Sequence, residues 1–393
     1  MKSIRQSFSV KFTYDVVFTR DLFSKENTVL LDILTSDSSE GPKKVAIVID
    51  QGVVDHHPDL IEKITEYFSI NNNIIKLTGT PLVMPGGEEV KNDYENVDTI
   101  LHQINDEKID RHAYMICIGG GALLDMVGFA ASIGHRGIRH IRIPTTVLSQ
   151  NDSAVGVKNG VNFLGKKNFI GNFEPPFAVL NDANFLTTLN DRDWRSGVSE
   201  AFKVALIKDK TFYEWLENNV TQLANRDLDT MEILVERCAK MHLDHIANSG
   251  DPFEKGSSRP LDFGHWSAHK LEQLSNFEIK HGEAVAIGIC LDVAYSLLKG
   301  MLSETDYKRI VSCFVLLGFD LQNKHLFSED GKSINAALLK GLEEFREHLG
   351  GKLTIMLLED IGIGVEVHEM DNDLLSKAAL LLKDTIDNYE YQK

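Results

Sequence analysis

The sequence predicts an α/β domain with a parallel sheet flanked by helices, followed by a mostly α-helical domain. Two observations predict this fold class: short β-branched runs alternate with helical segments in the first half, and long amphipathic stretches replace them after about residue 189. The chain has 393 residues, more than the roughly 250–300 over which one hydrophobic core usually extends. We therefore expect two domains, residues 1–185 and residues 186–393.

The strands of the first domain are predicted at 43–50, 114–119 and 138–146, where β-branched residues cluster. The first run ends in a polar turn and leads to the helical segment 57–68. The second passes through three glycines into the helical segment 120–132. This alternation is typical of parallel strands joined by helices.

The second domain is predicted from stretches with helical periodicity. These amphipathic stretches lie at 199–209, 231–247, 282–298 and 373–387. A late run, 352–360, predicts a strand that completes a sheet edge. No glycine- or proline-rich linker marks the domain boundary.

Charge and composition exclude several classes of partner. The net charge of −17 at pH 7 disfavours nucleic-acid binding, which draws on an excess of Lys and Arg, although a local lysine cluster can still bind an anionic small molecule. Residues 1–20 lack the apolar core of a signal peptide, and no run of about 18 apolar residues predicts a membrane span. The four cysteines form no CxxC pair and are expected to be buried apolar residues. We therefore predict a cytoplasmic protein with no nucleic-acid and no membrane partner.

Three glycines at 119–121 lie where a predicted strand meets a predicted helix. Backbone N–H groups at such a helix start favour an anion such as a pyrophosphate, and Asp125 one turn later could bind a cofactor hydroxyl. The GxGxxG spacing is missing, so a tight turn without a ligand is an equal alternative. A second glycine turn at 85–91 contains Glu88 and Glu89, and there a solvated helix start is the favoured interpretation.

The segment 143–173 is polar and has little apolar periodicity. It contains Lys158, Lys166 and Lys167 together with several asparagines and glycines. Polar loops of this length inside a compact domain are uncommon and are often functional. We therefore expect a loop whose lysines bind a phosphate, with Asp152 pairing with them or with a cofactor amide.

Two histidines of the second domain, His265 and His269, are four residues apart in a helical stretch, so their imidazoles share one face. His281 follows at the start of an apolar helix, and Glu200 is a carboxylate within another. One carboxylate and two imidazoles are a common ligand set for a catalytic zinc ion. Ligands this far apart are no spacing signature, so ordinary helix residues remain an alternative.

Other titratable residues have weaker signals. Lys203 follows Glu200 by three residues on the same helix face. His242 and His245 also share a face, but no third ligand stands beside them, and we favour a structural or rim position. Arg259 either meets an acid group or a phosphate, or is a solvated loop arginine.

The order of the motifs carries a family resemblance. The chain contains, in sequence, GGGALLDMVGFAAS, HRGIRHIRIPTTVLSQNDSAVGVKNGVN, KNFIGNF, LTTLNDRDWRSGVSEAFKVALIKD, RPLDFGHWSAHKLE and KHGEAVAIG. This series resembles the dehydroquinate synthase superfamily, the sugar phosphate cyclases, from about Asp50 to Gly288 and more weakly beyond. The resemblance implies a Rossmann-like NAD-binding domain, a helical metal- and substrate-binding domain, and a homodimer.

The resemblance also implies roles for individual residues. Glu200, His265 and His281 match the ligands of a divalent cation, zinc in most members with Co²⁺ as an alternative. The positions that match NAD contacts are Asp50, Glu88, Lys91, Gly120, Gly121, Asp125, Thr145, Thr146, Lys167, Asn168 and Thr188. The positions that match contacts to the sugar phosphate or catalytic residues are Arg136, Asp152, Lys158, Asn168, Lys203, Lys240, Arg259 and His269.

The implied family chemistry explains this set of residues. A hydride passes from a ring carbon to NAD, and the ketone that results acidifies the neighbouring C–H. Phosphate then leaves by elimination, the hydride returns, and the opened ring closes by an aldol step. The metal acts as a Lewis acid, lysines and arginine neutralise the phosphate, and NAD ends unchanged.

The chain departs from the family pattern at the substrate. Asp262 replaces a substrate-contacting asparagine, Trp266 replaces a threonine, and FREHLGG (345–351) lacks a lysine expected near the substrate. Arg346 is a candidate to compensate for that lysine. An added negative charge and a lost positive one disfavour an acidic substrate by the sign of the Coulomb energy alone.

These observations lead to one hypothesis and two alternatives. We predict an NAD- and metal-dependent cyclase, a carbon–oxygen lyase acting on phosphates, whose substrate is a ketose phosphate with an uncharged tail, such as sedoheptulose 7-phosphate. The first alternative is an authentic 3-dehydroquinate synthase. The second is an oxidoreductase like glycerol dehydrogenase, which the lysine-rich segment disfavours because a polyol carries no phosphate.

Overall fold

The computed structural model describes residues 3–36, 41–248, 253, 262–348 and 351–390. The chain divides into two compact units, residues 1–145 with 154–185 and residues 146–153 with 186–393. The sequence-based division after residue 185 assigns residues 146–153 to the first domain. In the structure, the contacts of this segment assign it to the second unit. The first unit is an α/β fold and the second is mainly helical, so the predicted fold class is confirmed.

The first unit is built on a seven-stranded, all-parallel sheet. Its order is β1-β9-β6-β5-β2-β3, with β4 also paired to β2. The strands are β1 (Asp15–Thr19), β2 (Lys43–Asp50), β3 (Ile75–Leu77), β4 (Leu82–Met84), β5 (Tyr114–Gly119), β6 (Arg139–Pro144) and β9 (Ala178–Asp182). The helices are α1 (Val29–Thr35), α2 (Gln51–His56), α3 (Leu60–Ile70), α4 (Glu95–Asp106) and α5 (Gly121–Ile133), with short helices η1 (Glu88–Asn92) and η2 (Gly134–Arg136).

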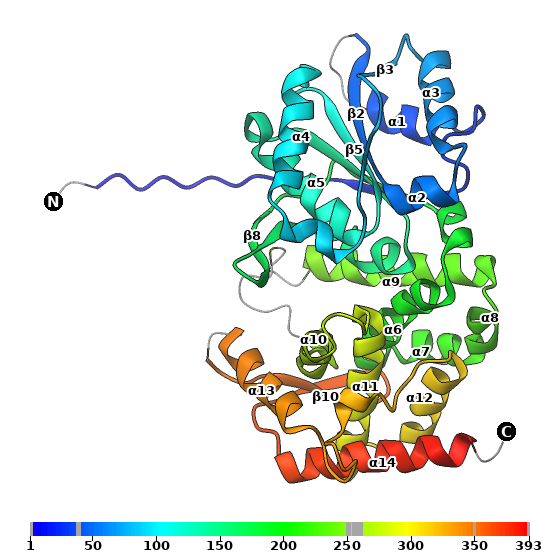
Figure 1. The fold of residues 1–393 in the computed structure, drawn as a ribbon, viewed down its shortest axis with the longest axis vertical. Helices are drawn as coiled ribbons and strands as arrows, with labels where there is room; N and C mark the ends of the chain where they lie inside the picture. Colours follow the sequence, from blue (N-terminus) through cyan, green and yellow to red (C-terminus); the bar gives the residue numbers. More distant parts are fainter. Residues whose placement is uncertain (1–2, 37–40, 249–252, 254–261, 349–350, 391–393) are drawn as a thin grey trace. The chain divides into compact units, whose positions relative to one another are not determined.

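Alternate residues of the central strands bury into two separate cores. On β2, Val45 and Ile47 pack in the core that contains residues of α1 and α3, whereas Ala46 and Val48 pack in the core that contains residues of α4 and α5. Figure 1 shows β2 and β5 between these two helical layers. Because both faces are covered, these strands are almost continuously apolar, which is why the sequence signal was clear.

Residues 158–173 form an antiparallel hairpin, so the predicted long loop was wrong over this part of the segment. The hairpin consists of β7 (Lys158–Phe163) and β8 (Lys166–Phe173). The chain before it is held by the buried guanidinium of Arg142, which donates to the carbonyls of Ala154 and Gly156 at 2.8 and 2.7 Å. These non-local hydrogen bonds order a sequence that has little apolar periodicity of its own.

The second unit contains nine α-helices and one small sheet among the described residues. Its helices are α6 (Asp191–Lys208), α7 (Lys210–Asn218), α8 (Val220–Ala224), α9 (Leu228–Asn248), α10 (His265–Leu274), α11 (His281–Leu298), α12 (Glu304–Leu316), α13 (Ala336–His348) and α14 (Asn372–Glu390). Shorter turns are η3 (Ser149–Ser153), η4 (Ala183–Thr188), which spans the boundary between the units, and η6 (Lys324–Leu326).

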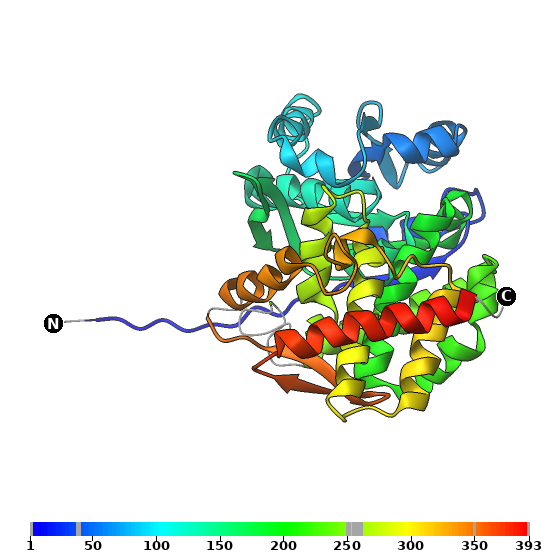
Figure 2. The same ribbon diagram turned by 60° about the horizontal axis from the view of Figure 1, so that its bottom comes forward.

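Helix α11 is the centre of this unit. It contacts α6, α10, α12, α14 and the strand β10 (Ile355–Asp360), and Figure 2 shows α14 lying across it. By length and composition α11 is the one described helix apolar enough to cross a membrane, but 78% of the stretch is buried inside the protein. A mostly buried helix of this kind is typical of the core of a helical domain.

The strand predicted at 352–360 exists, but it does not complete an edge of the large sheet. It is β10, which pairs antiparallel with β11 (Ile363–Val367) in a separate two-stranded sheet of the helical unit. The cysteines are free and buried, as predicted.

Candidate metal and catalytic site

Helix α6 positions the central carboxylate of the site. Glu200 lies on the buried face of α6 and is 1% exposed. One turn earlier, Ser196 packs against the start of α11, where a Cβ atom on Gly282 would lie 2.0 Å from the carbonyl oxygen of Ser196. Only glycine at position 282 lets the start of α11 pack this closely against α6. The close packing brings His281, the residue before Gly282, beside Glu200.

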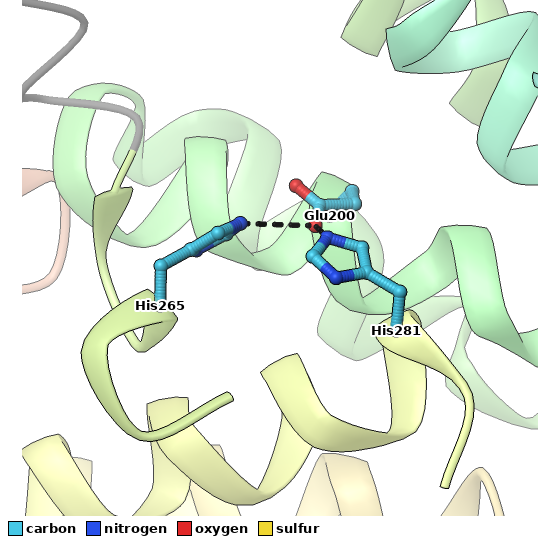
Figure 3. A group of neighbouring side chains, drawn as sticks. All are labelled: Glu200, His265 and His281. Carbon is cyan, nitrogen blue, oxygen red and sulfur yellow. Dashed lines mark ion pairs between the residues drawn. The ribbon is translucent and has the colours of Figure 1, made fainter. Parts of the chain in front are cut away.

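The imidazoles of His265 and His281 converge on Glu200. Oε1 of Glu200 lies 3.5 Å from Nε2 of His281 and 3.7 Å from Nε2 of His265, as drawn in Figure 3. Oε1 has no hydrogen-bond partner among the described residues although it is buried. Two ligand atoms about 2.1 Å from a tetrahedral ion lie about 3.4 Å apart. The spacing therefore fits three ligands of one divalent cation.

His265 is held in the form that a metal ligand needs. Its Nδ1 lies 3.0 Å from the carbonyl oxygen of Phe263, which accepts the Nδ1 proton and leaves Nε2 bare toward Glu200. Burial, together with the positive charge of Lys203, lowers the pKa of His265 to about 3. The imidazole is therefore neutral at physiological pH.

His281 is the first residue of α11 and lies between two carboxylates. Its Nδ1 is 3.2 Å from Oε2 of Glu272, and its Nε2 faces Glu200. Burial lowers the pKa of His281, but the contacts with Glu200 and Glu272 outweigh it and raise the pKa to about 9. These carboxylates favour a positive charge at His281, whether a proton or a metal cation carries it.

Lys203 places a permanent positive charge beside the carboxylate. Its Nζ forms an ion pair with Oε2 of Glu200, and its side chain is only 5% exposed. Burial lowers the pKa of Lys203, but Glu200, Asp152 and Asp262 raise it above its ordinary value. Conversely, burial raises the pKa of Glu200, but Lys203 and the two imidazoles hold it well below the usual range. Both groups are charged at neutral pH.

A second acid joins this cluster from η3. Asp152 is one of the carboxylates that raise the pKa of Lys203, and its Oδ1 lies 2.9 Å from Nδ1 of His242 on α9. Burial raises the pKa of Asp152, yet His242 and Lys203 lower it below the ordinary value. The sequence interpretation of His242 as a structural or rim residue missed this contact, because η3 and α9 are far apart in the chain.

Two further predicted residues of the second unit lie on α9 and α10. Lys240 is exposed, and because it precedes His242 by two helical positions, about 200° of rotation, it lies on another face of α9. His269 is exposed, and its ring centroid is 5.5 Å from that of His265 and 6.0 Å from that of His281. His269 is thus beside the proposed ligands, where a substrate-side residue is expected. Arg259 lies outside the described residues.

In the first unit, residues predicted to bind NAD gather at the carboxyl ends of neighbouring strands. Asp50 ends β2 and accepts a hydrogen bond from the N–H of Gly52 at 2.8 Å. A Cβ atom on Gly86, just after β4, would lie 2.2 Å from Oδ2 of Asp50, and one on Gly119, at the end of β5, would lie 3.1 Å from the Cβ of Asp50. Gly120 is the N-cap of α5, whose first N–H groups can receive a phosphate. This edge of a parallel sheet is where dinucleotides bind in such folds.

A buried lysine links further predicted NAD residues. Nζ of Lys91 lies 3.0 Å from Oδ2 of Asp125 and 3.8 Å from Oε1 of Glu88, and it donates to Oδ1 of Asn168. Burial raises the pKa of Asp125, and the charge of Lys91 opposes this shift. The cluster connects η1, α5 and the hairpin.

The remaining predicted residues are placed as follows. In the first unit, Gly121 begins α5, Thr145 is buried with its N–H bonded to the carbonyl of Gly119, and Arg136, Lys158 and Lys167 are exposed. In the second unit, Thr146 bonds to Ser149 within its turn, and Thr188 is exposed.

Comparisons with known proteins identify the family of the chain. Two family profiles match, described as 3-dehydroquinate synthase N-terminal over residues 81–196 and 3-dehydroquinate synthase C-terminal over residues 197–339. The 3-dehydroquinate synthase of Nitrosospira multiformis is 35% identical over 321 residues, 81% of this chain and 83% of that protein. That of Bacillus cytotoxicus is 32% identical over 357 residues, 90% of this chain and 89% of that protein.

The chain belongs to the dehydroquinate synthase superfamily.

Two solved structures share the fold of this member of the superfamily. The structure of ValA, a 2-epi-5-epi-valiolone synthase from Streptomyces hygroscopicus subsp. jinggangensis with NAD⁺ and Zn²⁺ bound, has a TM-score of 0.84 at 28% identity and covers 97% of this chain and 99% of that one. Glycerol dehydrogenase from Schizosaccharomyces pombe has a TM-score of 0.63 at 14% identity, covering 99% and 94%, and shares the fold alone.

Three described residues were predicted to depart from the family pattern, namely Asp262, Trp266 and Arg346. Asp262 is half-buried and contributes to the raised pKa of Lys203. The indole N–H of Trp266 donates to Oδ1 of Asp292 at 2.9 Å. Arg346, the candidate to replace the missing lysine, forms an ion pair with Glu343 at 2.6 Å.

Proposed function

We propose that the protein is a sugar phosphate cyclase that uses NAD and a divalent metal ion, eliminates phosphate and closes a carbocycle. The observation that carries this proposal is the convergence of Glu200, His265 and His281 beside the buried ammonium of Lys203. Membership of the dehydroquinate synthase superfamily supports it. ValA, the structural relative at 28% identity, has NAD⁺ and Zn²⁺ bound.

The three ligand residues suit zinc or cobalt. They supply two imidazole nitrogens and one carboxylate oxygen, all within 4.8 Å of one another, and leave a coordination position for substrate. A cation held there supplies Lewis-acid polarisation of substrate oxygens. NAD, bound at the strand ends around Asp50 and Gly120, supplies a temporary hydride acceptor.

The charges of the neighbouring residues define their parts in this chemistry. Lys203 cannot act as a base because its raised pKa keeps it protonated, so it stabilises negative charge that develops on a substrate oxygen. Asp152 is ionised and can accept the hydrogen bond of a substrate hydroxyl. His242 fixes that carboxylate at 2.9 Å. His269, exposed beside the ligands, is positioned to contact the substrate.

The preferred substrate is a ketose phosphate with an uncharged tail, such as sedoheptulose 7-phosphate. Asp262 adds a carboxylate close enough to Lys203 to raise its pKa, and a substrate carboxylate approaching Lys203 would be repelled by this negative charge. Arg346, the candidate for a compensating positive charge, is paired with the carboxylate of Glu343 on its own helix. The valiolone synthase activity named for ValA agrees with a neutral sugar.

The experiment is phosphate release by purified protein with NAD and Zn²⁺. Sedoheptulose 7-phosphate should release phosphate, and Glu200→Gln should abolish the reaction. Efficient turnover of the heptulosonate 7-phosphate acid and none of the neutral sugar would identify an authentic 3-dehydroquinate synthase instead. NADH that accumulates steadily with glycerol would identify an oxidoreductase.

The same proposal includes a homodimer in the cytoplasm. Light scattering of the purified protein in solution measures its mass directly, and a mass twice that of the 44.0 kDa chain is the expected result.

A further inference from the structure

Two buried carboxylates near the ligand cluster have no part in the chemistry described above. Glu272 on α10 is 5% exposed, and Asp292 on α11 is fully buried. A buried carboxylate is costly unless hydrogen bonds compensate it, so each requires a reason for its position. Both lie where α10 and α11 pack against each other within the second unit.

Asp292 reaches from α11 to the start of α10. Its Oδ1 accepts from the indole N–H of Trp266 at 2.9 Å, and its Oδ2 accepts from the backbone N–H of Gly264 at 3.2 Å. These donors are the residues immediately before and after His265. The carboxylate therefore holds the backbone before one proposed ligand, His265, and the side chain of the residue after it.

The backbone at this point leaves little freedom. Gly264 has φ +77°, and a Cβ atom on it would lie 2.7 Å from the N atom of Ile289 on α11. A Cβ atom on Gly288 would lie 2.0 Å from the carbonyl oxygen of Gly264. The start of α10 is therefore in close contact with the backbone of α11 at Gly288 and Ile289. Asp292, one turn after Gly288 on α11, adds a hydrogen bond to the same start of α10.

Glu272 makes the reciprocal contact from α10 to the start of α11. Its Oε2 lies 3.2 Å from Nδ1 of His281 and so directs Nε2 toward Glu200. The turn between the helices is ordered by Ser275, whose hydroxyl donates to the carbonyl of Glu272 at 3.0 Å and accepts from the N–H of Ile279 at 3.1 Å.

We propose that Glu272 and Asp292 are positioning residues for the two ligand histidines. Glu272 on α10 holds His281 at the start of α11, and Asp292 on α11 holds the residues beside His265 at the start of α10. Together they set the affinity of the site for its cation. The inference rests on the proposed metal dependence. Residues that orient ligating imidazoles typically change metal affinity by 10- to 100-fold when they are removed. Trp266, one of the departures from the family pattern, gains a specific function as the partner of Asp292.

The first test concerns Glu272. Glu272→Ala should weaken Co²⁺ binding to the full-length protein about 10- to 100-fold at pH 8, measured by competition with a chelator, and should alter the visible absorption of bound Co²⁺. Glu272→Gln keeps an acceptor for the Nδ1 proton and should restore most of the affinity. Glu278→Gln, which neutralises an exposed acid six residues further on, is the matched control and should bind Co²⁺ like the wild type.

The second test concerns Asp292. Asp292→Ala and Trp266→Phe should each weaken Co²⁺ binding, and the double variant should lose less than the sum of the two, because both remove the same contact. Ser296→Ala is the control for general destabilisation. Ser296 is equally buried on α11, where its hydroxyl donates to the backbone carbonyl of Asp292 and accepts from the N–H of Leu358, so the variant leaves the Asp292 carboxylate and its contacts with α10 in place. It should lower the unfolding temperature without changing the Co²⁺ affinity.

The outcomes separate this inference from the proposed function. Wild-type protein that binds Co²⁺, together with Glu272→Ala and Asp292→Ala proteins that bind it equally well, would overturn the inference and leave the cyclase proposal intact. Two Co²⁺ ions per wild-type chain, with one lost in Glu272→Ala, would also overturn it, because Glu272 would then be a ligand in its own right. Wild-type protein that binds no Co²⁺ would contradict both proposals.

Discussion

At the scale of single residues, the charge of each site group is decided by its neighbours. His265 and His281 have the same side chain, yet the pKa of one is lowered to about 3 and that of the other is raised to about 9. Burial lowers the pKa in both cases. The difference arises because contacts with Glu200 and Glu272 raise the pKa of His281, whereas the positive charge of Lys203 lowers the pKa of His265 further and its Nδ1 meets only a neutral carbonyl group.

Lys203 should be essential for turnover but not for metal binding. Lys203→Met removes the ammonium that stabilises developing negative charge and should lower kcat about 100-fold or more, while Glu200 remains free to bind the cation. Phosphate release and metal content measure the two effects separately. Lys208→Met, an exposed lysine near the end of α6, is the control and should retain full activity. Loss of the metal together with activity would show instead that Lys203 only supports the ligands.

Asp262 should control the charge of the accepted substrate. Asp262→Asn removes one negative charge near Lys203, and we expect KM for a carboxylate-bearing sugar phosphate to fall about tenfold, since two unit charges about 10 Å apart interact by about 1.7 kcal/mol at an effective dielectric constant near 20. KM for the neutral ketose phosphate should not fall. An equal change for both substrates would mean that Asp262 does not discriminate by charge.

At the scale of secondary-structure elements, the start of α10 depends on a glycine. Gly264→Ala should destabilise the protein through the positive φ and through a clash with the N atom of Ile289. Gly300→Ala is a matched control, because Gly300 has nearly the same φ, +76°, with nothing within 4 Å of an added Cβ. The control should cost about 1 to 2 kcal/mol for the left-handed backbone, and Gly264→Ala about 1 to 3 kcal/mol more. Urea unfolding of the two variants measures the difference, and equal losses would contradict the clash.

The elements that the sequence could predict are those whose pattern depends on burial alone. The strands β2, β5 and β6 and the helices α6, α9, α11 and α14 are long apolar or amphipathic runs, so their type was evident, whereas the other strands of the central sheet were not predicted. The hairpin of residues 158–173 was missed because its order depends on the distant Arg142, and the partner of β10 was missed because pairing is a property of the fold. The same limit applies to the site, since Glu272 and His242 join it through contacts between separate elements.

At the scale of the whole molecule, burial of Asp292 should shape the dependence of stability on pH. Burial raises the pKa of Asp292 to about 7, opposed only by the hydrogen bonds from Trp266 and Gly264. Because this folded-state pKa is above the unfolded value of 3.8, the folded protein binds a proton more tightly than the unfolded chain. The contribution of this group to stability is therefore greatest at low pH, declines as the pH rises from about 4 to about 7, and is constant above that.

A comparison with Asp292→Asn isolates this contribution, because asparagine does not titrate. The free energy of unfolding of the wild type should fall relative to that of the variant by up to about 1.4 kcal/mol for each pH unit, most steeply between pH 5 and pH 6, and the difference should level off above pH 7. Urea unfolding of both proteins at pH 5, 6, 7 and 8, with a chelator present to remove any linkage to metal binding, measures the slope. Two parallel profiles would show that Asp292 keeps an ordinary pKa in the folded protein, and its carboxylate would then be fully ionised in the contact with α10 at every pH in this range.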